Sequence, residues 1–172
     1  MRKIHREDWF AAGKNVLEAY GFARLTIDEL CSSLNMTKGS FYHHFHNMDG
    51  YIVAFMQYWT EQHTLDFIRK AESQRLLGGK AEFLARLAAE LNSGAERAIR
   101  AWSSASALVR MYLQQVDAIR LKYLEGLMLE QGLEGAAALG SARLEYALMV
   151  GMQQLYPGLS RQELLALYEL RS

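Results

Sequence analysis

Apolar residues recur every three or four positions along most of this 172-residue chain, a spacing that is typical of amphipathic helices. The pattern predicts about nine helices, and the breaks between them contain glycine, asparagine or proline. The predicted helices cover residues 6–20, 27–34, 38–45, 48–71, 80–92, 95–103, 105–131 and 135–156, and a last helix begins near Ser160. In the first of them, Trp9 and Tyr20 are both expected to face the core. The chain is therefore predicted to be all-α.

The stretch from Thr26 to Phe45 has the most informative pattern. Thr26 and Glu29 have the spacing of a reciprocal capping box, so a helix is expected to begin there. It is expected to end at Asn35, a residue that tolerates the left-handed backbone conformation. Thr37 can cap a second, short helix that Phe41 and Phe45 attach to the core. A helix, a sharp turn and a second helix on a small core form the architecture in which the second helix enters the DNA major groove.

These residues resemble the DNA-binding head of the TetR family of transcriptional repressors, in register from Ile4 to about Phe55. The matching segments are Gly21-Phe22, Thr26-Ile27 with Leu30, every residue of the run TKGSFYHHF from Thr37 to Phe45 except His43, and Asn47. Beyond Phe55 the resemblance is one of helix order. It implies a helix-turn-helix domain over residues 1–47, a linking helix over about 48–71, and an effector-binding and dimerisation domain over 48–172.

The resemblance also implies which side chains meet DNA. The groove-facing set would be Lys38, Gly39, Ser40, Tyr42 and His43. Thr37, which caps their helix, is also expected to be a DNA-binding residue. Lys38 could donate to guanine O6 or N7, and Gly39 permits close approach. Phosphates would be held by Thr26, Tyr42, His44 and the helix start at Asn47. Met48 stands where the family usually has lysine, which removes one expected phosphate contact.

Charge alone does not indicate a nucleic-acid-binding protein. The chain has 19 basic and 19 acidic residues and a net charge of zero. The first fifty residues have no net charge either. Their basic residues are Arg2, Lys3, Arg6, Lys14, Arg24 and Lys38, and their acidic residues, equal in number, are Glu7, Asp8, Glu18, Asp28, Glu29 and Asp49. The DNA-binding hypothesis therefore rests on the geometry of the motif.

The remaining helices are expected to hold an effector site and a dimer interface. The candidate pocket lining is Trp59, His63, Phe83, Trp102, Met111, Tyr112, Gln115 and Tyr146, a mixture that suits a partly apolar, aromatic or acyl ligand. The last two helices carry more apolar surface than one small domain covers, which together with the resemblance predicts half of a four-helix interface. Its candidate residues are Leu144, Leu148, Gly151, Met152, Leu155, Leu164, Leu167 and Tyr168. An ordinary buried hairpin is the alternative.

Other kinds of chemistry have little support in the sequence. It contains no GxSxG, CxxC, HExxH or phosphate-binding glycine loop, so no enzyme activity and no cofactor are predicted. His43 and His46 lack a third metal ligand on their face, and the single Cys31 is expected to pack in the core. No apolar run suits a membrane span, and a cytoplasmic location is expected.

The resulting hypothesis is a homodimeric transcriptional repressor that binds a palindromic DNA operator and is released by a small-molecule effector. The alternative is a DNA-binding regulator that a partner protein controls, with no small-molecule ligand.

Overall fold

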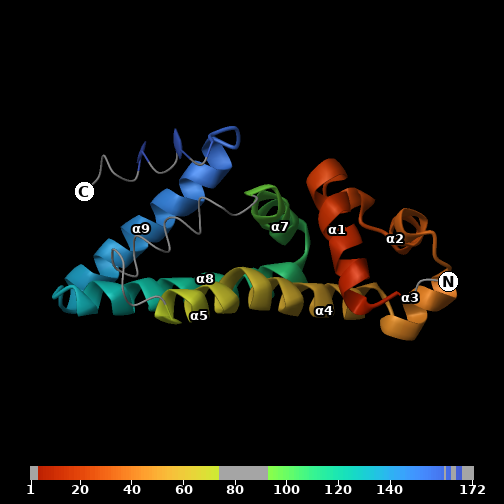
Figure 1. Ribbon diagram of the computed structural model, residues 1–172, viewed down its shortest axis with the longest axis horizontal. Coiled ribbons are helices and arrows are strands. Elements are labelled where there is room, and N and C mark those ends of the chain that lie inside the picture. Colours follow the sequence, from red (N-terminus) through yellow and green to blue (C-terminus); the bar gives the residue numbers. More distant parts are fainter. Residues whose placement is uncertain (1–3, 74–92, 161, 164–165, 168–172) are drawn as a thin grey trace. The chain divides into compact units, whose positions relative to one another are not determined.

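The computed structural model describes residues 4–73, 93–160, 162–163 and 166–167, and all regular elements in these ranges are helical. They are α1 (Arg6–Tyr20), η1 (Phe22–Arg24), α2 (Ile27–Leu34), α3 (Lys38–His44), α4 (Met48–Thr60), η2 (Glu61–Leu65), α5 (Asp66–Ser73), α7 (Ser93–Ala105), α8 (Ala107–Glu130) and α9 (Gly135–Leu155) (Figure 1). The prediction of an all-α fold is confirmed. Within these ranges no helix is both long enough and apolar enough to cross a membrane.

The helix boundaries agree closely with the hydrophobic pattern, with one exception. The predicted helix over 48–71 is observed as α4, η2 and α5, because the five residues Glu61–Leu65 form a π-helix between two α-helical segments. The predicted helix over 80–92, and most of the one after Ser160, lie outside the described residues.

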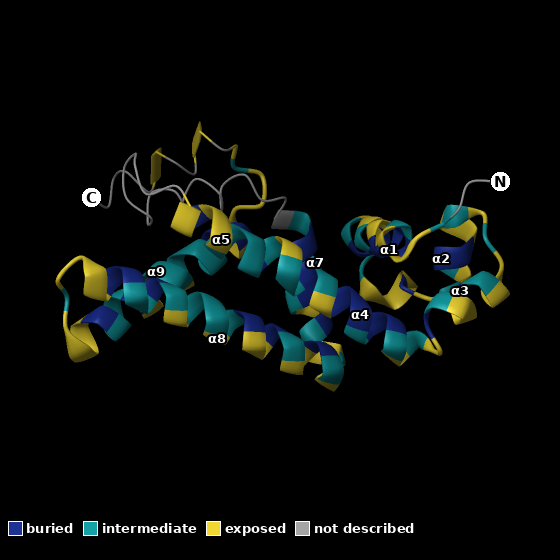
Figure 2. Ribbon diagram, turned by 60° about the horizontal axis from the view of Figure 1, so that its bottom comes forward, coloured by how far each residue is buried: buried dark blue, intermediate teal, exposed yellow. Residues whose placement is uncertain are grey.

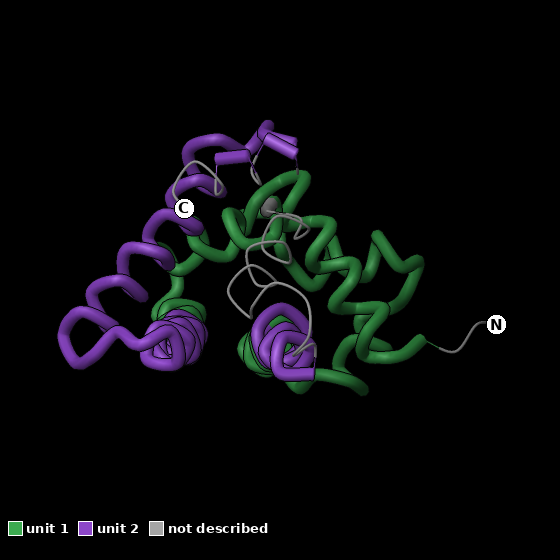
Figure 3. The backbone as a smooth tube through the Cα atoms, turned by 60° about the vertical axis from the view of Figure 1, so that its left-hand side comes forward, with its two compact units in different colours: residues 1–59, 94–114 green, residues 60–93, 115–172 purple. Residues whose placement is uncertain are grey.

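The chain divides into two compact units, coloured separately in Figure 3. Unit 1 comprises Met1–Trp59 and Gly94–Gln114, and unit 2 comprises Thr60–Ser93 and Gln115–Ser172. The predicted domain boundary between residues 47 and 48 stays a prediction.

An aromatic cluster forms the core of the head in unit 1. The ring of Trp9 meets Phe41 edge to face with centroids 5.5 Å apart, and Phe45 lies 5.1 Å from Tyr51. Phe10 extends the cluster along α4 and stacks on Tyr58 at 4.8 Å. Edge-to-face and offset contacts of this kind stabilise a core beyond simple area burial. The cluster therefore joins α1, α3 and α4.

Burial along the head follows the predicted pattern, apart from one aromatic residue. Figure 2 shows buried residues on α1, α2 and α4 and mostly exposed residues along α3. Tyr20 was expected in the core but is 65% exposed, since it occupies the last turn of α1 beyond the cluster. There its ring meets the guanidinium of Arg24 at 5.9 Å.

The helix starts are set by short polar contacts. The Glu29 N–H donates to Thr26 Oγ1 at 3.2 Å, as predicted. The reciprocal half of the capping box is absent, because the Thr26 N–H donates to the Arg24 carbonyl and the Glu29 carboxylate accepts from the Arg24 guanidinium. Asn35 has φ 52° and ψ 46°, which confirms the predicted left-handed end of α2.

A close backbone approach requires glycine in the middle of α1. The Tyr51 hydroxyl donates to the Trp9 carbonyl at 3.0 Å, and Tyr51 is fully buried. A Cβ atom at Gly13 would lie 1.9 Å from the Tyr51 hydroxyl oxygen. Because Gly13 has no side chain, the Tyr51 hydroxyl has room to reach the backbone of α1.

In unit 2, alanines allow α8 and α9 to pack closely. Ala138 and Ala142 are completely buried in a cluster with Leu124, Leu127 and Met128. The small side chains on α9 lie against the larger ones on α8, so the two helices can approach each other closely.

A half-buried polar network in unit 2 connects the π-helix to α8 and α9. Arg120 donates to Thr64 Oγ1 at 3.0 Å, to the His63 carbonyl at 3.3 Å and to the Tyr146 hydroxyl at 3.4 Å. The Tyr146 hydroxyl in turn donates to Asp117 at 2.5 Å. Because π-helical turns displace the regular i to i+4 bonds, side-chain donors such as Arg120 help to satisfy the carbonyls there.

Replacing Gly13 by Ala is expected to destabilise the protein, because the new methyl group would collide with the Tyr51 hydroxyl. Overpacking of this kind costs about 1–3 kcal/mol, whereas the same change in an open helix interior gains up to about 1 kcal/mol. The free energy of unfolding in urea should therefore fall. Gly126→Ala in α8 is the matched control, since a Cβ there meets nothing within 4 Å among the described residues.

Adding Tyr51→Phe to Gly13→Ala should recover part of the loss, because the hydroxyl that collides is removed. If Gly13→Ala were as stable as Gly126→Ala, the contact between Tyr51 and α1 would not be a constraint on the fold.

Candidate nucleic-acid interface

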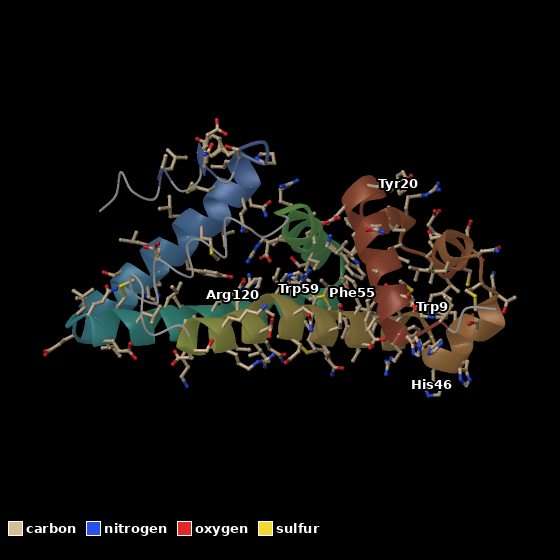
Figure 4. The ribbon with its side chains drawn as sticks, in the orientation of Figure 1. Trp9, Tyr20, His46, Phe55, Trp59 and Arg120 are labelled. Atoms are coloured by element: carbon tan, nitrogen blue, oxygen red, sulfur yellow. The ribbon has the colours of Figure 1, made fainter. Side chains whose placement is uncertain are left out.

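The short helix α3 is held from one side only. Phe41 is completely buried and Phe45 nearly so, and both rings contact Trp9. Thr37 caps the helix, since its Oγ1 accepts from the Ser40 N–H at 3.3 Å. Figure 4 labels Trp9 within the head and His46 at its outer edge, just beyond the end of α3. Seven residues cannot form a stable helix alone, so this anchoring keeps α3 folded.

The other side of α3 carries the residues predicted to face the groove. Lys38, Gly39, Tyr42 and His43 are exposed, and Ser40 is half-buried. The structure therefore brings these five residues together on one short helix. His44 differs from them: it is half-buried, with its ring centroid 6.2 Å from Trp9 and 6.0 Å from Phe45.

Three predicted contact residues are helix caps. Thr26, Thr37 and Asn47 each accept a backbone N–H at the start of α2, α3 or α4, the last from Gly50 at 2.8 Å. All three are exposed. Each cap accepts one backbone N–H of the first helical turn. The other N–H groups of that turn have no partner within the helix, and such groups bind anions at helix N-termini.

Basic side chains in the head are paired with acids from the first turn of α2. Lys38 Nζ lies 2.7 Å from Asp28 Oδ1, and a guanidinium nitrogen of Arg24 lies 2.9 Å from Glu29 Oε2. The hydrogen bond to Asp28, together with its charge, raises the pKa of Lys38, which stays protonated. The pairing of Lys38 with Asp28 crosses from α2 to α3 and has no signal in the sequence.

A second cation lies beside the end of α3. The Arg6 guanidinium sits over the Phe45 ring, 5.0 Å from its centroid. Burial lowers the pKa of His44, and the nearby charges of His43, Arg6 and His5 lower it further, while Glu7 opposes them. The sequence gives no signal of this contact, since Arg6 and Phe45 are distant along the chain.

Metal or thiol chemistry has little support in this region. Across the described residues, no group of three His, Cys, Asp or Glu side chains could hold a metal ion. Cys31 is buried, and this burial, more than the charge of Asp28, raises the pKa of its thiol. The thiol therefore stays protonated and inert.

The predicted effector residues are distributed over both units. Trp59, Trp102, Met111 and Tyr112 belong to unit 1; His63, Gln115 and Tyr146 belong to unit 2; and Phe83 lies outside the described residues. Trp59 and Trp102 are buried, whereas Met111 and Gln115 are exposed. His63 and Tyr146 both contribute to the polar network around Arg120. Their contact with a ligand stays a prediction.

The predicted dimer residues on α9 divide between two faces. Leu144 and Leu155 are 73% and 71% exposed, Leu148 and Gly151 are half-buried, and Met152 is buried within its own chain. Met152 therefore lies on the inner face of α9. Farther along, Leu167 is exposed, while Leu164 and Tyr168 lie outside the described residues.

Comparison with known proteins agrees with this geometry. Residues 10–54 match the family model described as bacterial regulatory proteins, tetR family, and this range covers most of α1, all of α2 and α3, and about half of α4. The match confirms the resemblance that the sequence of the head indicates. A search among curated proteins gives no match.

Solved structures of similar fold cover nearly the whole chain. A TetR transcription regulator from Haloarcula marismortui is 16% identical, with a TM-score of 0.76 over 96% of this chain and 93% of that one. The reduced form of NemR from E. coli is 18% identical, with a TM-score of 0.75 over 96% of both chains. The fatty acid degradation regulator FadR from Bacillus halodurans is 14% identical, with a TM-score of 0.72 over 99% and 94%. At these identities the likeness shows the fold.

Proposed function

From its DNA-binding head, which is that of the TetR family of transcriptional regulators, we propose that the chain is a ligand-responsive repressor that binds a palindromic operator as a homodimer. The observation that carries this proposal is the division of α3 into two sides. One side is fixed in the aromatic cluster, and the other presents exposed polar groups to a partner.

In the proposed complex, α3 lies in the major groove. Lys38 donates to guanine O6 or N7, and Ser40, Tyr42 and His43 meet neighbouring base edges or a thymine methyl group. The phosphates are bound by Thr26, Tyr42, His44 and the Asn47 helix start. Arg6 lies beside His44 over the Phe45 ring, so it supplies a positive charge in place of the lysine that Met48 replaces.

Gly39 supports this arrangement because the fold does not need a glycine there. A Cβ at this position would make only ordinary contact with Thr37 Oγ1, at 3.6 Å. Glycine inside a helix is less stable than alanine by about 1 kcal/mol. An external surface that approaches α3 closely explains why the smaller residue is present.

The direct test is selection of duplexes from a random-sequence pool. The protein should enrich an inverted repeat, since a two-fold dimer presents two copies of α3 to two half-sites. Failure to enrich any sequence would overturn the proposal.

Replacing Gly39 by Ala should weaken binding to the selected duplex by about fivefold or more, because an added methyl group blocks close approach of α3 to the groove and each lost base contact is worth about 1–3 kcal/mol. The melting temperature should stay equal or rise. Gly126→Ala is the control, with unchanged affinity. Full affinity in Gly39→Ala would show that α3 does not enter the groove at this residue.

Affinity for the selected duplex should rise as pH falls from about 8 to about 6. The pKa of His44 is lowered in the free protein, and an adjacent phosphate would raise it on binding. At pH values between the pKa of His44 in the free protein and its pKa in the complex, His44 is protonated in the complex but not in the free protein. Affinity therefore increases as pH falls through the pKa of the bound state, and it levels off below that of the free state.

His44→Gln should flatten this pH dependence, and His46→Gln, on an exposed neighbour, should leave it intact. The dependence should be steeper at low salt, where phosphate contacts contribute most. A level wild-type affinity, measured at fixed salt with folded protein, would assign His44 a neutral role.

The proposed dimer uses the outer face of α9. Leu144, Leu148, Gly151 and Leu155 follow each other at three- and four-residue spacing, and two of these leucines are more than two thirds exposed. Large exposed leucines in such a row are characteristic of a helix that packs against a partner. A second copy of the chain presents the same face and would cover it.

Gly151→Trp is expected to produce monomers, measured by light scattering, because the indole would separate the paired helices. Within one chain a Cβ at Gly151 meets nothing within 4 Å among the described residues, so the fold itself should tolerate the change. Gly126→Trp is the matched control and should remain dimeric. A dimeric Gly151→Trp protein would place the interface elsewhere.

The proposal and its alternative differ in the response to a small molecule. In the alternative, a partner protein controls the regulator and no small-molecule ligand binds. The buried indoles of Trp59 and Trp102, both in unit 1, suit a ligand that is mainly apolar. A compound that raises the melting temperature and also releases DNA supports this part. Release only by another protein would favour the alternative.

A further inference from the structure

The ion pair between Asp28 and Lys38 is placed at the start of the proposed recognition helix. The two charged atoms are 2.7 Å apart, although the side chains are 74% and 59% exposed. Exposed pairs of this kind contribute little to folding stability. The consequence of the pair is therefore expected at the surface that DNA approaches.

Lys38 is attracted to two different parts of a duplex. Phosphates attract a lysine wherever the protein lies along DNA, so this attraction carries no sequence information. A guanine edge offers acceptors only at one place in the groove. An acid that restrains the lysine changes the balance between these two destinations.

We propose that Asp28 is a specificity-determining residue, which holds Lys38 at the base-reading side of α3 and opposes its capture by phosphates. This inference rests on the proposed function. Asp28 acts in two ways. Its carboxylate gives the ammonium a fixed partner at one end of α3, and its own negative charge is repelled by the DNA backbone. Both effects lower the affinity for non-specific DNA more than they lower the affinity for the operator.

The adjacent pair of Arg24 and Glu29 fits the same arrangement. Consecutive acids in the first turn of α2 hold the two cations, at 2.7 Å and 2.9 Å. The head thus pairs these two cations with its own acids, and the four residues contribute to the even balance of charge in its first fifty residues.

The experiment measures binding of Asp28→Asn to two probes: the duplex selected by the wild type, and a 30-base-pair duplex of scrambled sequence. At salt concentrations from 50 to 200 mM, Asp28→Asn should bind the scrambled duplex about threefold or more tightly than the wild type does. The slope of its log affinity against log salt should be steeper by about 0.9, the value for one additional phosphate contact. Affinity for the selected duplex should rise less. The ratio between the two affinities should therefore fall.

A double-mutant cycle with Lys38→Met separates the two residues' effects. In the Lys38→Met background, Asp28→Asn should leave the affinity ratio unchanged, because the restrained cation is gone. Asp49→Asn is the matched control, an exposed acid at the start of α4 that removes the same charge. It should change affinity for both probes by the same factor, so that the ratio between them stays at the wild-type value and no coupling to Lys38 is found.

The outcomes distinguish this inference from the proposed function. If the wild type selects no duplex, the proposed function fails and the inference falls with it. If the wild type selects a duplex but Asp28→Asn keeps the wild-type ratio, or changes it equally with and without Lys38, only the role of Asp28 is overturned.

Discussion

The hydroxyl of Tyr51, buried against α1, is the contact on which the geometry of the head depends. It donates to the Trp9 carbonyl through the gap that Gly13 leaves, so it fixes the spacing of α4 and α1. Burial raises the pKa of Tyr51 far above its ordinary value, and the group remains a neutral donor. The rings of Phe41 and Phe45 then pack on the same tyrosine, at 5.8 Å and 5.1 Å. The position of α3 therefore follows from a bond that involves no residue of α3.

Most of the helix boundaries could be predicted from the sequence, because they depend on neighbours close along the chain. The Thr26 cap, the left-handed Asn35 and the Thr37 cap each use residues within three positions of the helix end. The π-helix could not be predicted in this way. Apolar spacing continues from α4 through Glu61–Leu65, and the polar partner there, Arg120, is 56 residues away from Thr64.

The exposure of the candidate residues on α3 was predictable from the sequence, but the electrostatics around them were not. The polar positions of α3 were evident once Phe41 and Phe45 were assigned to the core. The pairing of Lys38 with Asp28, and the position of Arg6 over Phe45, depend on the angles between helices, which amino-acid spacing does not specify. The same reason explains Tyr20, whose aromatic character suggested burial although its turn of α1 extends past the core.

The two-sided construction of α3 has a consequence for how such a protein diversifies. The residues that keep the helix folded are Thr37, Phe41 and Phe45, whereas those at 38, 39, 42 and 43 are exposed. Substitutions on the exposed side therefore change stability little, as is usual for surface positions. Under the proposed function, selection can consequently change the DNA sequence that α3 binds without passing through unfolded variants. The fold and the recognition code can evolve as nearly independent traits.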